Sequence, residues 1–207
     1  MNRADIVWIT GVAFVAVTIA PLLKAVGLLP HDLLVSWGLP FPGLEQIFFG
    51  PLMAVLLLLC FIKTARPSIF PAIGILRAVA LGFVFPANLE HLGTGIAGIL
   101  AGFVAAAVMR NGDGVRLSRQ LSLLAALYSG LYAAGNYSTS VLFGPPAQTR
   151  IIMLSPKFAV LVVAGSFALG GLLGAMTIAG MRLTRILPSR MVAPPRPALG
   201  AIELILN

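Results

Sequence analysis

The sequence predicts an all-α integral membrane protein with six transmembrane helices and both termini in the cytoplasm. Hydrophobic residues make up 59% of the 207 residues and charged residues 10%, with a mean hydropathy of +1.01. This composition leaves too little polar surface for a soluble globular domain. The apolar residues fall into six stretches, and basic residues gather in alternate connections between them. We therefore expect a multi-pass protein of the cell membrane.

The six apolar stretches each approach the roughly 20 residues, about 17 to 25, that an α-helix needs to cross the hydrocarbon core. In order, they are residues 6–28, 45–62, 69–85, 93–109, 121–142 and 157–181. The first has no small-residue cleavage site, so we expect it to be kept as a helix. The third carries Pro71 in its first turn, where the missing N–H is harmless. The third and fourth are short.

The distribution of basic residues predicts the orientation. Ten of the 14 Lys and Arg residues lie in inner segments if the N-terminus is cytoplasmic: Arg3, Lys63, Arg66, Arg110, Arg116, Arg119, Arg182, Arg185, Arg190 and Arg196. Because basic residues accumulate in cytoplasmic loops, both termini are expected inside. Residues 1–187 then form the six-helix domain, and residues 188–207 form a cytoplasmic tail. The net charge of +8 is spread between the spans, so we expect no nucleic-acid binding.

Enzyme motifs are nearly absent. The chain has no GxSxG, HExxH or GKS/T pattern, so we expect neither an enzyme nor a protein that hydrolyses ATP alone. His31 next to Asp32 and His91 next to Glu90 fall in different outer loops. A metal site made by all four would match no familiar zinc signature. We predict no metal and no cofactor.

Polar residues at membrane depth converge toward the outer side. We select as candidate substrate-binding residues Glu45, Arg77, Asn88, Glu90, Tyr132 and Asn136. Ionisable groups in a membrane are costly unless they are paired or hydrated, so such a cluster indicates a ligand site. The alternative is a belt of polar groups facing the lipid headgroups. Arg77 fits that belt least well and needs a partner, for which Glu45 and Glu90 are the candidates.

One face of the fifth stretch presents two rings and an amide, because Tyr128, Tyr132 and Asn136 are each four residues apart. Such a face suits a flat, partly polar molecule such as a heterocycle or vitamin precursor. Tyrosines that only pack in a core would give the same pattern. The sequence leaves these two interpretations open.

Small residues recur at four-residue spacing, which allows close packing of helices in lipid. They are Ala16 and Ala20; Gly98, Gly102 and Ala106; Ala164 and Ala168; Gly170 and Gly174. Packing within the chain is the simplest interpretation. On the first helix, at the edge of the bundle, Ala16 and Ala20 are our candidates for docking another membrane subunit.

The layout resembles the substrate-binding S component of energy-coupling factor (ECF) transporters, in the YkoE-like branch associated with thiamine or its hydroxymethylpyrimidine moiety. The likeness covers about residues 8–182 and rests on residues 41–45, 62–67, 93–102 and 164–174, together with the AxxxA face of the first helix. One departure is Arg77, because an acidic residue would be expected there for the cationic thiazolium of thiamine.

The resemblance implies a high-affinity substrate-capture subunit of an ECF-type ABC importer for a vitamin or related micronutrient. The partners would be a transmembrane coupling subunit, which the family meets through positions here occupied by Ala16 and Ala20, and two cytoplasmic ABC ATPases. The competing hypothesis is a non-catalytic accessory subunit of a larger membrane complex, which would also show small-residue faces and few motifs.

Overall fold

The computed structural model describes residues 3–26, 44–84, 91–111, 114–143 and 155–183. Over these residues the chain is all-helical, as predicted, and each helix overlaps one of the six apolar stretches. The helices are α1 (Arg3–Ala25), α3 (Gln46–Thr64), α4 (Ile69–Val84), α5 (Leu92–Asn111), α6 (Gly114–Phe143) and α8 (Pro156–Leu183).

Four of the helices are long and apolar enough to cross a membrane. These spans are Asp5–Leu23, Gln46–Thr64, Leu92–Arg110 and Pro156–Leu183. Helix α4 is apolar but has only 16 residues. Helix α6 has 30 residues, and its C-terminal part is rich in Tyr, Ser, Thr and Asn, which lower its hydropathy. The four spans support a membrane protein.

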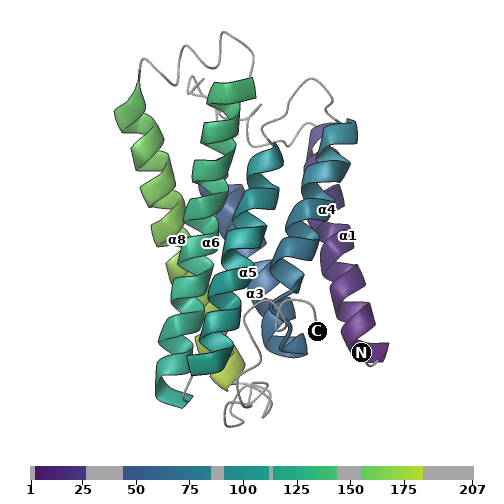
Figure 1. Ribbon diagram of the computed structural model, residues 1–207, viewed down its shortest axis with the longest axis vertical. Helices are drawn as coiled ribbons and strands as arrows, with labels where there is room; N and C mark the ends of the chain where they lie inside the picture. Colours follow the sequence, from purple (N-terminus) through teal and green to yellow (C-terminus); the bar gives the residue numbers. More distant parts are fainter. Residues whose placement is uncertain (1–2, 27–43, 85–90, 112–113, 144–154, 184–207) are drawn as a thin grey trace.

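The helices run alternately up and down and lie side by side along one long axis (Figure 1). Helix α6 packs most extensively against α8 and α5, and α4 packs against α5. Helix α3 lies behind these helices and contacts α8, α6 and α1. Helix α1 packs on α3 and α4 at the edge of the bundle. The result is a bundle whose interior is bounded by all six helices.

Glycines allow three of the helix contacts to be very close. A Cβ atom added to Gly93 would lie 2.2 Å from the carbonyl carbon of Gly135, so α5 and α6 touch backbone to backbone. A Cβ added to Gly98 would lie 2.5 Å from the Phe70 carbonyl oxygen of α4, and one added to Gly170 would lie 2.4 Å from Ser129 Cβ. The glycine spacings seen in the fourth and sixth stretches, at Gly98 and Gly102 and at Gly170 and Gly174, therefore serve packing within the chain.

The apolar core fills the part of the bundle toward the C-terminal end of α3. Its largest fully buried side chains include Phe61, Phe70 and Tyr128, whose rings contact one another in series, edge-to-face between Phe61 and Phe70 and tilted between Phe70 and Tyr128. The ring centroids are 5.6 Å apart between Phe61 and Phe70 and 5.9 Å apart between Phe70 and Tyr128. These separations are typical of favourable aromatic pairs.

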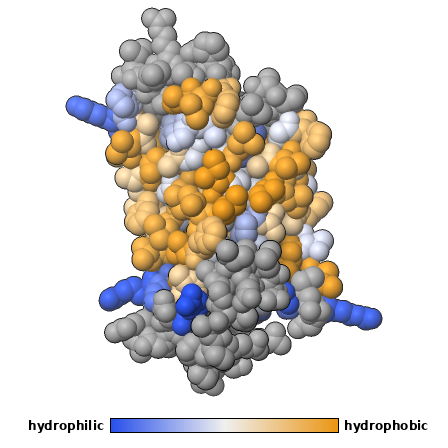
Figure 2. Space-filling view, in the orientation of Figure 1, coloured by the Kyte–Doolittle hydropathy of each residue, from blue (hydrophilic) through white to orange (hydrophobic). Residues whose placement is uncertain are grey.

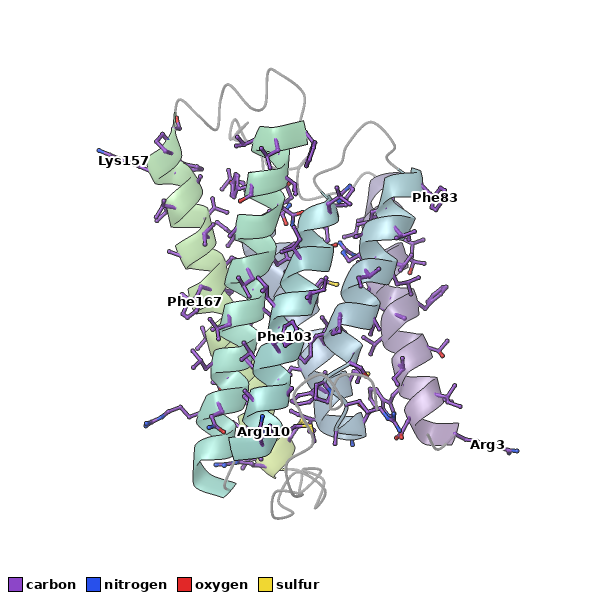
Figure 3. All side chains as sticks on the ribbon, in the orientation of Figure 1. Arg3, Phe83, Phe103, Arg110, Lys157 and Phe167 are labelled. Atoms are coloured by element: carbon purple, nitrogen blue, oxygen red, sulfur yellow. The ribbon has the colours of Figure 1, made fainter. Side chains whose placement is uncertain are left out.

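The surface shows an apolar belt with hydrophilic side chains at its two ends (Figure 2). Helix α1 begins and α8 ends at the same end of the bundle, where Arg3 and Arg110 also lie, whereas Lys157 lies at the opposite end (Figure 3). Helix α6 starts at Gly114, seven residues before the stretch predicted from hydropathy. Arg119 therefore lies within a helix and not in a loop. Long arginine side chains at a helix end reach polar surroundings without breaking the helix.

Candidate polar site inside the bundle

Arg77 is the charged centre of a polar site within the bundle. It lies in the middle of α4, and its side chain is only 3% exposed. Its Nη1 group donates a hydrogen bond to the backbone carbonyl of Ala16 in α1. Its Nη2 group donates to Tyr132 Oη in α6 at 3.2 Å, and the guanidinium carbon lies 6.0 Å from the centroid of the same ring. Arg77 thereby connects α4 to both α1 and α6.

The acceptor in α1 lies one turn before a proline. Pro21 lies inside α1 and has no N–H to donate to the carbonyl four residues earlier, which belongs to Val17. The carbonyl that accepts from Arg77 is that of Ala16, the residue before Val17.

Hydrogen bonds connect Tyr132 to two side-chain amides, those of Asn136 and Gln46. Asn136, one turn later on α6, donates from Nδ2 to the Tyr132 carbonyl at 2.9 Å and to Gln46 Oε1 of α3 at 3.2 Å. Gln46 Nε2 lies 3.4 Å from Glu45 Oε1, at the long end of the hydrogen-bond range. Four residues that the sequence selected are thus connected: Arg77 to the Tyr132 hydroxyl, the Tyr132 carbonyl to Asn136, and Asn136 through Gln46 to Glu45.

His91 lies near these hydrogen-bonded residues, one residue before the span Leu92–Arg110. Burial and, to a smaller extent, the Arg77 charge lower its pKa to about 4, and Glu45 opposes this change. The imidazole is therefore neutral near pH 7. The same influences place His91 within electrostatic range of both Arg77 and Glu45, so the start of α5 belongs to the site.

A second polar cluster fastens α3, α6 and α8 together. Ser129 Oγ donates to the Ser166 carbonyl at 2.7 Å, and Ser166 Oγ lies 3.2 Å from the Gln46 carbonyl. Both serines are fully buried, and Gly50 gives them room, since a Cβ there would lie 2.5 Å from Ser166 Oγ. Because these hydroxyls bond to the protein itself, this cluster has a structural role.

Two further candidates, Asn88 and Glu90, lie outside the described residues, as do His31 and Asp32 of the conceivable metal site. Arg77 was expected to pair with Glu45 or Glu90, but the hydrogen bonds described for it run to Ala16 and Tyr132. Sequence reasoning missed Gln46. Its position next to Glu45, at the start of an apolar stretch, was the available signal.

The structure separates the two tyrosines that the sequence treated alike. The Tyr128 ring is fully buried between Phe70 and Tyr132, at centroid distances of 5.9 and 6.1 Å. It therefore packs in the core, as the plainer interpretation held. Tyr132 instead presents its hydroxyl to Arg77.

The proposed docking face on α1 needs correction at Ala16. Its side chain is 1% exposed and belongs to the hydrophobic core, so it faces α3 and α4 and not an external partner. The side chain of Ala20 lies outside the described part of the structure. By contrast, Ala164 and Ala168 are exposed on the surface of α8 that faces away from the bundle interior.

No protein-family model, curated protein or solved structure matches this chain. The likeness to ECF S components therefore rests on the sequence residues quoted above.

Proposed function

We propose that this chain is the substrate-capture subunit of an ECF-type importer and binds a small, partly polar heterocycle in the polar site. The observation that carries the proposal is the hydrogen-bonded series of buried Arg77, Tyr132 and Asn136 with half-buried Gln46, within an apolar bundle. Polar and ionisable groups inside a membrane protein are costly and usually serve binding or transport. Three helices contribute to this series, so a ligand there would contact α3, α4 and α6 together.

Energy for release would come from other subunits, because the sequence has no nucleotide-binding motif. The partners we propose are a transmembrane coupling subunit and two cytoplasmic ABC ATPases. The proposed orientation has six membrane-crossing helices with the basic end of the bundle in the cytoplasm and the polar site toward the outside.

A specific observation favours the accessory-subunit alternative. An open apolar groove of about 630 Å³ lies between α3 and α8, with Phe48, Leu52, Leu173 and Met176 among its lining residues. In a membrane, such a groove next to exposed small residues suits either lipid chains or another subunit. An accessory subunit would use this face and need no small molecule.

Ligand binding is the direct test of the proposed function. We expect a vitamin-like heterocycle, whether thiamine, hydroxymethylpyrimidine or a heterocyclic acid, to raise the melting temperature of the protein in detergent. Asn136→Ala should weaken this binding by roughly 1 to 3 kcal/mol, because a buried polar group of the ligand or of Gln46 loses its partner. Ser138→Ala, at an exposed position on the same helix, is the matched control and should bind normally. If no candidate shifts the melting temperature and no small molecule co-purifies, the accessory-subunit alternative should be preferred.

Orientation can be tested with single cysteines in a Cys60→Ala background. Lys157→Cys and Arg119→Cys are exposed positions near opposite ends of the bundle. A membrane-impermeant thiol reagent should label Lys157→Cys on intact cells and Arg119→Cys only after permeabilisation, because the basic end should face the cytoplasm. The reverse order of labelling would reject the orientation.

A further inference from the structure

The guanidinium of Arg77 has hydrogen-bonding capacity that its described partners do not use. A guanidinium offers five N–H donors. Nη1 and Nη2 each donate one described hydrogen bond, whereas Nε is buried and has no hydrogen-bond partner among the described residues. A buried donor without an acceptor is costly, which makes this edge of Arg77 the place for a further group.

The acceptors that Arg77 already has do not neutralise its charge. One is a backbone carbonyl and the other is a phenol, and both are uncharged. A charge in an apolar interior is stable only when it is paired and hydrogen-bonded. His91 adds no positive charge near pH 7, because burial and Arg77 lower its pKa to about 4. The unused edge of Arg77 therefore favours an anion.

We propose that the ligand carries a carboxylate, which Arg77 holds through Nε and one Nη group while the amides of Asn136 and Gln46 contact the remainder of the molecule. This inference rests on the proposed function and specifies its substrate class as heterocyclic acids. The side-on pair of Nε and Nη donors matches the two oxygens of a carboxylate. A phosphate dianion fits less well, since Arg77 is the one basic side chain among the described groups of the site.

Glu45 is the competing acceptor within the chain. It influences the same histidine as Arg77, and its Oε1 atom faces the amide of Gln46. If Glu45 were the partner that balances Arg77, removing either charge would destabilise the protein without any ligand. If the ligand supplies the anion, Glu45→Gln should keep the preference for acids, and Arg77→Gln should lose it.

The test uses the full chain purified in detergent and two matched pairs of probes, nicotinate with nicotinamide and orotate with uracil. We expect an acid to raise the melting temperature at a concentration about 10-fold or more below that of its neutral partner, as charge-assisted hydrogen bonds are the stronger ones. Arg77→Gln should remove this difference, and Arg77→Lys, which keeps the charge, should retain part of it. Arg119→Gln, exposed and near the basic end, is the matched control.

Equal binding of both members of a pair, or an acid preference that survives in Arg77→Gln, would overturn the inference. If neither pair shifts the melting temperature, the molecules that co-purify with the wild type should be identified by mass spectrometry. A carboxylic acid that is lost in Arg77→Gln would support the inference, and a neutral molecule would overturn it while leaving the proposed function intact. If no molecule is bound, both the inference and the proposed function are rejected.

Discussion

Gly93→Ala should be the most damaging conservative substitution in the bundle. The added Cβ would lie 2.2 Å from the Gly135 carbonyl carbon and 2.4 Å from the Asn136 backbone nitrogen, so α5 and α6 would have to separate. Overpacking of this kind costs about 3 kcal/mol, and here backbone atoms leave no side chain to move aside. We expect a melting temperature in detergent lower by several degrees, or a failure to accumulate in the membrane.

Gly11→Ala is the matched control for this substitution. Gly11 is exposed within α1, and no atom lies within 4 Å of a Cβ added there. Alanine is favoured over glycine inside a helix by roughly 0.5 to 1 kcal/mol, so the control should melt at the same temperature or higher. If both variants melt like the wild type, the backbone contact between α5 and α6 described above is wrong.

Ala16→Leu should reduce stability and ligand binding together. Ala16 is buried against the bundle, and its carbonyl accepts the hydrogen bond from Arg77, so a larger side chain would push α1 away from α4. Overpacking a filled position costs about 1 to 3 kcal/mol. Melting temperature and retention of a bound ligand, measured on one purified sample, should both fall.

Val15→Leu provides the comparison, because Val15 is adjacent in sequence but 38% exposed. It should melt and bind as the wild type does. The docking hypothesis for α1 makes the opposite prediction for Ala16→Leu, in which transport and recovery of the coupling subunit are lost while melting and binding are unchanged. That result would mean that Ala16 faces outward from the bundle.

The positions of the helices could be predicted because hydropathy is a property of consecutive residues and can be read directly from the sequence. Five of the six predicted stretches begin within three residues of the observed helices, and the remaining one, the fifth at 121–142, missed the polar first turns of α6. Those turns carry Arg116, Arg119 and Gln120, which lower hydropathy but are good helix formers. The sequence could therefore mark where a membrane-buried segment starts, but not where its helix starts.

The site was predictable only where its residues share one helix. The four-residue spacing of Tyr132 and Asn136 is a local property, and both side chains are buried on the inner face of α6. The contact of Asn136 with Gln46 depends on the relative position of α3 and α6 along their axes, which no local sequence pattern specifies. The partner of Arg77 was harder still, because every residue has a backbone carbonyl and the sequence does not distinguish that of Ala16.

The position of α1 depends on a charged hydrogen bond as well as on packing. Only 12% of its candidate membrane span is buried inside the bundle, compared with 61% for that of α3, so most of its surface is not covered by the other described helices. Its bond from Arg77 is a charged hydrogen bond in an interior of low dielectric constant, and such bonds strengthen as water is excluded. The protein should therefore hold its first helix most firmly when its interior is dry, and any entry of water beside Arg77 would loosen α1 before the glycine-packed helices.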